Sequence, residues 1–172
     1  MSEKWHFVPQ RKIPVLNYIL PPATILLAQM LALIPGHFLS GVMPLLGVCV
    51  IFYWALYRPR FIPLWQAFLL GLVADVFFSP VLGLYALIYI FVRQIGEGQR
   101  RYLAMRNFTI LWVTFSVMMA GIFMIKSFYM TSMGYAHDPL VLIKYAQTCL
   151  AFPLVYYVFA RTHHFLIYEG WL

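Results

Sequence analysis

Long apolar runs, separated by short polar connections, dominate this sequence and restrict the folds that it can adopt. A helix needs about 17–25 apolar residues to cross the ~30 Å hydrocarbon core of a bilayer. Six segments reach or approach that length, at about residues 15–34, 39–57, 62–78, 81–92 or slightly beyond, 108–130 and 140–160. We therefore predict an all-α polytopic membrane protein with six transmembrane helices.

The composition supports a bilayer as the solvent of this chain. Of its 172 residues, 63% are hydrophobic and 10% are charged, whereas soluble domains carry about 25% charged residues. A chain of this size has too much surface to hide so many apolar side chains from water. We expect one integral membrane domain over residues 1–172, with a short cytoplasmic segment at 1–12. The run at 13–35 exceeds the roughly 7–15 residues of the apolar h-region of a cleaved signal peptide, so we expect it to be a retained membrane anchor.

The basic residues predict the orientation, because Lys and Arg collect on the cytoplasmic side of membrane proteins. Ten of the 12 basic residues fall on one side of the predicted spans, and the other two are Lys126 and Lys144. The ten are Lys4, Arg11, Lys12, Arg58, Arg60, Arg93, Arg100, Arg101, Arg106 and Arg161. Both termini are thus predicted to be cytoplasmic. The net charge of +7 then reflects topology and attraction to anionic lipids, and nucleic-acid binding is not expected.

The third and fourth spans form a short hairpin, because 32 residues between Arg60 and Arg93 must supply two crossings and a turn. Asp75 lies in the outer half of the third span. A carboxylate facing lipid costs about 2.5–3.5 kcal/mol on insertion scales, so it should face protein or water. Two interpretations remain open: a hydrogen-bonded packing residue, or a contact with a partner or an ion pathway. Lys126 is the preferred internal partner, as a direct ion pair.

Small residues mark the same hairpin. Ala67, Gly71 and Ala74 follow one another at spacings of four and three, which allows a neighbouring backbone to approach closely. Pro80 breaks the third span, and Gly83 suits a tight turn or a close approach. Packing within the chain and contact with a partner both remain open for these residues.

The segment after the fourth span carries Arg93, Glu97 and Arg101 at successive i,i+4 positions. They can line one helix face at the cytoplasmic surface, together with Arg100. This strip is either a solvated topology signal or a docking site for anionic lipid or a cytoplasmic protein. Arg58 marks the preceding cytoplasmic turn.

Enzymatic chemistry is not expected. The sequence has no HExxH, GxSxG or Walker-type motif, and its carboxylates are not paired. We predict no catalytic, cofactor-binding or metal-binding residues and no cofactor. A membrane enzyme is therefore the least favoured function class.

The stretch FYWALYRPRFIPLWQAFLLGLVADVFFSPVLGLYAL, residues 52–87, resembles the bacterial rod shape-determining MreD family. The resemblance rests on YWALYRP at 53–59, GLVAD at 71–75, the PVLG turn at 80–83, where the family more often has PLG, and AL at 86–87. It implies a non-enzymatic inner-membrane scaffold of the cell-elongation complex. The implied partners are membrane lipids, an MreC-like bitopic protein and, indirectly, the MreB filament and the peptidoglycan polymerase/transpeptidase pair.

The predicted architecture is also similar to the substrate-binding subunits of energy-coupling-factor vitamin transporters. That likeness implies an alternative function as a small-molecule-binding membrane subunit. A vitamin binder needs an outward pocket with converging polar groups. The outward polar residues are few, which favours the scaffold.

Overall fold

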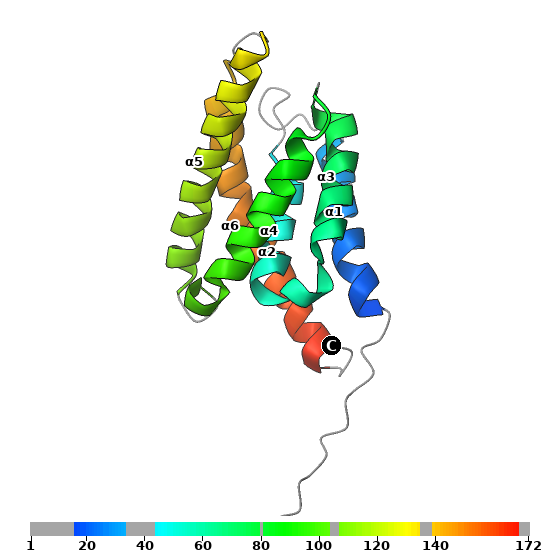
Figure 1. The fold of residues 1–172 in the computed structure, drawn as a ribbon. Coiled ribbons are helices and arrows are strands. Elements are labelled where there is room, and N and C mark those ends of the chain that lie inside the picture. The colour runs from blue at the N-terminus through cyan, green and yellow to red at the C-terminus, as the bar shows by residue number, and fades with distance from the viewer. Residues whose placement is uncertain (1–15, 34–43, 80, 104–106, 135–138, 169–172) are drawn as a thin grey trace, which may run out of the picture.

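The computed structural model describes residues 16–33, 44–79, 81–103, 107–134 and 139–168, and this part of the chain is almost wholly helical (Figure 1). Its elements are α1 (Leu16–Leu33), α2 (Leu46–Tyr57), the short 3-10 helix η1 (Pro59–Phe61), α3 (Leu64–Phe78), α4 (Leu84–Leu103), α5 (Phe108–Ser132) and α6 (Val141–Tyr168). The prediction of six α-helices is thus confirmed for the described residues.

The prediction for the fourth helix was too short. It was expected to end near Val92, whereas α4 continues to Leu103 and includes the basic strip. The charged residues do not end the helix: Arg93 and Glu97 form an i,i+4 pair along it, and Arg100 and Arg101 lie in its last turn, where basic side chains interact favourably with the helix dipole. By contrast, α3 ends where the sequence indicated, since the residue before a proline is biased to extended backbone. Ser79 has φ −132° and ψ 138°.

Helix α2 is the centre of the bundle. It contacts α1, α4 and α6, and every residue from Gly47 to Leu56 is buried. Its 12 residues rise only about 18 Å at 1.5 Å per residue. Its side chains are therefore surrounded by the neighbouring helices along most of its length.

Three phenylalanines join α2 to the α5–α6 pair. Phe115 and Phe152 stack with ring centroids 4.1 Å apart. Phe52 contacts both rings, at 5.3 and 5.9 Å. All three side chains are fully buried, and such aromatic pairs contribute about 0.5–1.5 kcal/mol beyond their buried area. The α5–α6 pair is therefore packed on the rest of the bundle largely through α2.

Two described helices are long and apolar enough to cross a membrane, at Phe108–Ser132 and Val141–Arg161. Only 33% and 22% of the residues in their apolar windows are buried. Core helices of soluble proteins hide most of their apolar surface, whereas these two expose it, as a helix in lipid does. The other described apolar helices are shorter, at Tyr18–Leu33, Leu46–Tyr57 and Leu64–Phe78.

Candidate functional site

Asp75 caps the N-terminus of the neighbouring helix. Its Oδ1 accepts the backbone N–H of Tyr85 at 2.7 Å, and its Oδ2 accepts those of Gly83 at 2.9 Å and Ala86 at 3.2 Å. The first N–H groups of a helix have no partner within that helix, and its dipole favours a negative charge there. The fully buried carboxylate of α3 thus satisfies the start of α4 across the hairpin.

The turn between the two helices presents these N–H groups to Asp75. Gly83 has φ +97°, a backbone conformation that glycine adopts without steric cost. The Ser79 hydroxyl accepts the N–H of Val81 and donates to the carbonyl of the same residue. Pro80, the candidate turn residue between them, lies outside the described residues. The turn thus includes one backbone conformation with positive φ, and glycine occupies that position.

The helices reach capping distance because small residues line their contact. A Cβ added at Gly71 would overlap the backbone of Ala86 on α4, and Ala67 and Ala74 have no exposed surface. The face that the sequence marked with small residues is the one that lies against α4. The absence of a side chain at Gly71 is therefore what allows the N-terminal turn of α4 to lie within reach of Asp75.

Tyr85 lies between Asp75 and Lys126, and the direct ion pair that the sequence suggested is not formed. The three N–H groups already surround the carboxylate. The Lys126 Nζ instead donates to the Tyr85 hydroxyl at 2.8 Å and lies 4.7 Å from the centre of its ring. Counting charges along the spans cannot predict backbone donors, and three of them already occupy the carboxylate of Asp75.

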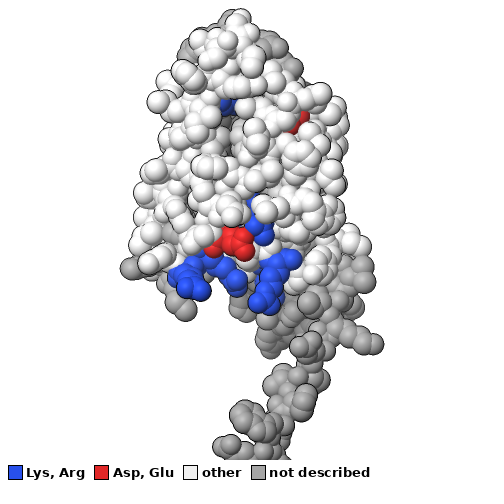
Figure 2. Space-filling view, in the orientation of Figure 1, with Lys and Arg blue, Asp and Glu red and all other residues white. Residues whose placement is uncertain are grey.

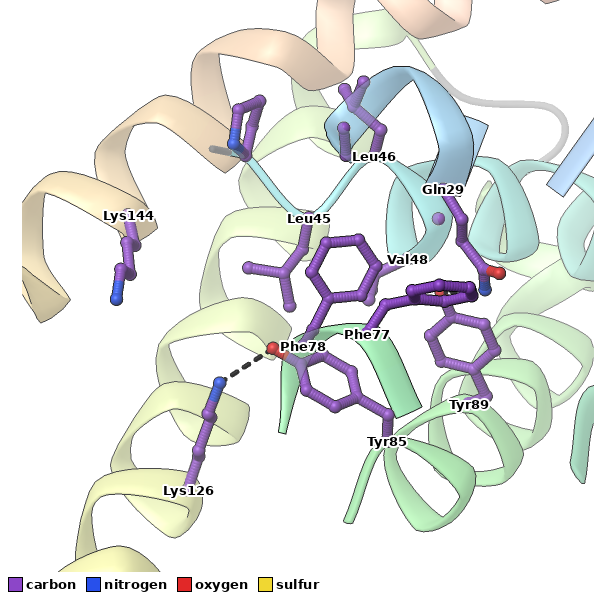
Figure 3. Close-up of a pocket in the computed structure, with 13 residues that line it drawn as sticks. Gln29, Leu45, Leu46, Val48, Phe77, Phe78, Tyr85, Tyr89, Lys126 and Lys144 are labelled. Atoms are coloured by element: carbon purple, nitrogen blue, oxygen red, sulfur yellow. Dashed lines mark hydrogen bonds between the residues drawn. The ribbon is translucent and has the colours of Figure 1, made fainter. Parts of the chain in front are cut away.

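A pocket of about 300 Å³ opens beside this network, at the end of the bundle that carries the α3–α4 turn (Figure 3). Its polar lining comes from α1, α4, α5 and α6, namely Gln29, Tyr85, Tyr89, Lys126 and Lys144. Aromatic and aliphatic residues of α2 and α3 complete it, among them Phe77, Phe78 and Val48. A basic side chain is visible inside a hollow in the upper part of the face shown in Figure 2.

Gln29 is the least solvated polar group of the pocket, at 1% exposure. Its Nε2 donates to the Leu70 carbonyl at 3.1 Å and to the Tyr89 hydroxyl at 2.9 Å. A carbonyl only accepts, so this contact fixes which end of the amide is the nitrogen. The Oε1 atom is buried and has no hydrogen-bond partner. An orphaned buried acceptor costs about 1–3 kcal/mol, and this oxygen has almost no accessible surface toward the pocket.

The opposite end of the bundle is basic (Figure 2). Arg93 is 8% exposed, and it donates to the Ile62 carbonyl at 2.8 Å and pairs with Glu97 at 2.5 Å. Arg93 thus fastens α4 to the turn after α2, as Asp75 does at the other end. Arg100 and Arg101 are exposed and can meet anionic groups there, while the Arg58 guanidinium lies over the Phe61 ring at 5.8 Å.

The candidate residues thus fall into two groups at opposite ends of the bundle. Ala67, Gly71, Asp75, Gly83 and Lys126 gather around the α3–α4 hairpin and the pocket, whereas the arginines gather at the far end. Gln29, Tyr85, Tyr89 and Lys144 were not predicted as site residues from the sequence. Gln29 carries the same signal as Asp75, a polar side chain inside an apolar run. Among the described residues, no group of three or more His, Cys, Asp or Glu could hold a metal ion.

These features define an all-helical membrane-type bundle with a capped hairpin and a basic end. The sequence model of the family described as rod shape-determining protein MreD matches residues 12–162. The chain therefore belongs to the MreD family, a family of membrane proteins with a role in rod shape determination, as the resemblance predicted. No match was found among curated proteins or among solved structures.

Proposed function

We propose that this chain is a non-enzymatic scaffold subunit of the bacterial cell-elongation complex, a multi-pass protein of the inner membrane. Membership of the MreD family over residues 12–162 carries this proposal. The direct partner is an MreC-like bitopic protein. Through that partner the chain connects to the MreB filament and to the peptidoglycan polymerase/transpeptidase pair.

The arrangement of charge supports the proposed orientation, with both termini in the cytoplasm. Arg58, Arg93, Arg100 and Arg101 belong to the basic end of the bundle, and Lys126 and Lys144 line the pocket near the other end. Because basic residues mark the cytoplasmic side, the pocket and the α3–α4 turn face the periplasm. The exposed Arg100 and Arg101 then lie at the level of anionic headgroups.

The α3–α4 hairpin is suited to holding a partner helix. The carboxylate of Asp75 is hydrogen-bonded within the hairpin. The outer surface of the hairpin carries large apolar side chains. Leu87 and Phe91, one helical turn apart on α4, are 66% and 50% exposed. A rigid, apolar surface of this kind packs against another transmembrane helix without ordering new polar groups.

Depletion and complementation in the native rod-shaped cell test the scaffold function. Depleted cells should become round, and the wild-type gene should restore both rod shape and crosslinked recovery of the MreC-like protein. Gly71→Val, which forces α3 from α4, should restore neither, whereas Gly98→Ala should restore both because nothing lies within 4 Å of its added Cβ. Depleted cells that keep their shape, with no elongation component in the crosslinked material, would contradict the proposal.

The pocket supports a second candidate, a small-molecule-binding subunit of an energy-coupling-factor type vitamin transporter. Gln29, Tyr89 and two lysines line one cavity, which is more polar than the sequence alone indicated. Recovery of a bound vitamin or of an ATPase module with the purified chain would favour this candidate over the scaffold.

A further inference from the structure

We propose that the side of the bundle formed by η1, α3 and α4 thins the bilayer, by drawing the headgroups of anionic phospholipids in one leaflet toward the arginines of η1 and α4. This inference goes beyond the scaffold function and does not depend on it, because it concerns the free chain in lipid. The partner is a lipid surface, and the group that is recognised is the phosphate.

The apolar part of this side is shorter than α5. Helix α3 has 15 residues and α5 has 25, which correspond to about 22 Å and about 37 Å at 1.5 Å per residue. The hydrocarbon core of a bilayer is ~30 Å thick, so α5 can cross it whereas α3 falls short by about 8 Å. A short span is accommodated by local thinning of the bilayer, by flanking side chains that reach the interface, or by association.

One contact sets the relative heights of α4 and α5. Tyr85, at the start of α4, accepts a hydrogen bond from Lys126, near the end of α5, and the two helices run antiparallel (Figure 1). Gly98 on α4 and Val113 on α5 each lie 13 residues from this contact. Because both helices rise by the same amount per residue, these two positions lie at about the same height in the bundle.

At this shared height α4 exposes polar positions and α5 exposes apolar ones. Over residues 94–101, the exposed positions of α4 are Gln94, Glu97, Gly98, Arg100 and Arg101. Over the matching residues 110–117, the exposed positions of α5 are Ile110, Val113 and Val117. A leaflet of uniform thickness would place acyl chains against the charged groups of α4, which is costly. Its headgroups therefore have to move inward on the α4 side.

The start of α3 lies at the height of the middle of α4. The Arg93 Nε on α4 donates to the Ile62 carbonyl at 2.8 Å, just before α3 begins. Arg60 on η1 is exposed, and Trp65, in the first turn of α3, is 61% exposed. Exposed tryptophan and arginine are typical of the boundary between membrane and water. On this side the boundary thus lies near the middle of α4 instead of at its end.

The charge of this surface selects anionic headgroups. In the described parts of the chain, the only acidic residues are Asp75, which caps α4, and Glu97, which is ion-paired on α4. Neither is left to neutralise the exposed Arg60, Arg100 and Arg101. Figure 2 shows basic side chains on both sides of one acidic patch at this end. Arginine can bind a phosphate through two parallel hydrogen bonds.

Thiol labelling of the full-length chain in nanodiscs tests the thinning, because both membrane surfaces are then in contact with water. Gly98→Cys and Val113→Cys are the matched pair at one height. We expect the first to react with a charged, water-soluble thiol reagent at least tenfold faster than the second. Wild type, with its buried Cys49 and Cys149, gives the background. Equal rates for the two variants, whether fast or slow, would overturn the thinning.

Lipid selectivity tests the role of the arginines. Native mass spectrometry of the full-length chain in detergent compares phosphatidylglycerol with phosphatidylcholine of the same acyl chains. We expect phosphatidylglycerol to bind at least tenfold more tightly. Arg100→Gln combined with Arg101→Gln should reduce this preference about fivefold or more, whereas the matched Arg100→Lys and Arg101→Lys variant keeps both charges and should retain most of it.

Two results of this comparison would overturn the recognition of lipid. One is equal binding of the two phospholipids by the wild-type chain. The other is a preference for phosphatidylglycerol that the glutamine variant leaves unchanged. Either result would leave the arginines of this surface available to an acidic protein instead of a lipid headgroup.

Discussion

The carboxylate of Asp75 accepts the backbone N–H of Tyr85 at 2.7 Å, and the side chain of the same tyrosine accepts a hydrogen bond from Lys126 at 2.8 Å. One residue thus joins an acidic and a basic side chain that do not touch each other. Its backbone holds the start of α4 against α3, while its ring and hydroxyl hold α4 near α5. Tyr85 therefore links the capped α3–α4 hairpin to α5.

Asp75→Leu should destabilise the bundle strongly. The substitution leaves three N–H groups without an acceptor. The buried ones, of Tyr85 and Ala86, cost about 1–3 kcal/mol each, and the negative charge at the helix N-terminus is lost as well. Asp75→Asn keeps one carbonyl oxygen and should lose about half as much. Fluorescence-detected unfolding in detergent measures both, with Val76→Ala, an exposed neighbour, as the control. An Asp75→Leu protein as stable as wild type would refute the cap.

The contact between Tyr85 and Lys126 should appear as an energetic coupling. Tyr85→Phe removes only the hydroxyl and leaves the backbone cap of Asp75 intact. We expect Tyr85→Phe and Lys126→Met to be non-additive by about 0.5–1.5 kcal/mol in a double-mutant cycle, as contacting residues are.

The Asp75→Asn and Lys126→Met pair provides the comparison. Because no direct contact joins their side chains, their unfolding free energies should add more closely than those of the tyrosine–lysine pair. A larger coupling for the acid–base pair would restore the direct ion pair and reject the arrangement through Tyr85.

Gly71 and Gly98 should respond to alanine with opposite signs. A Cβ at Gly71 would overlap the backbone of Ala86, whereas one at Gly98 meets nothing within 4 Å. Gly71→Ala should therefore cost about 1–3 kcal/mol, as overpacking does. Gly98→Ala should stabilise α4 by about 0.5–1 kcal/mol through helix propensity. Thermal unfolding of the two variants side by side checks the prediction, and equal shifts would contradict it.

Arg93 should contribute more to the free energy of unfolding through its hydrogen bond to the Ile62 carbonyl than through its ion pair with Glu97. Glu97 is 45% exposed in its side chain, so Glu97→Gln should cost about 0.3–0.5 kcal/mol, the value of an exposed i,i+4 pair. Arg93→Met also leaves the buried Ile62 carbonyl without its donor, so it should cost about 1–3 kcal/mol more.

Arg100→Met, at an exposed position of the same helix, is the control and should leave stability unchanged. Urea unfolding separates the three variants. If Glu97→Gln destabilised the protein as much as Arg93→Met, the ion pair would be the main contribution.

The helices themselves were predictable because apolar run length is a direct consequence of the solvent. The first, third and fifth helices end within a few residues of their predicted positions. The predicted end of the fourth helix, near Val92, was too early because the charged residues that follow were interpreted as the end of the span. On the same helix, a Cβ added at Gly96 would lie 2.8 Å from the Ala55 Cβ on α2. Close packing between distant helices is not encoded in either local stretch.

The depth of Asp75 and its need for protein partners followed from the cost of a carboxylate in lipid. The hydrogen-bond partners of Asp75 could not be predicted, because nearly every residue has a backbone N–H and the sequence does not show which ones lie near the carboxylate. The pocket was also unpredictable, since Gln29, Tyr85, Lys126 and Lys144 come from four helices. Their proximity depends on how α5 and α6 dock on α2.

The cap of Asp75 also bears on the order in which this chain can assemble. Its three hydrogen bonds join residues only 8, 10 and 11 positions apart, and closing so short a loop costs little chain entropy. We therefore expect the carboxylate of Asp75 to form its three hydrogen bonds as soon as α3 and α4 have been synthesised, before α5 and α6 exist. The hairpin then enters the bundle as a finished unit, and later helices dock on it with the carboxylate of Asp75 already enclosed.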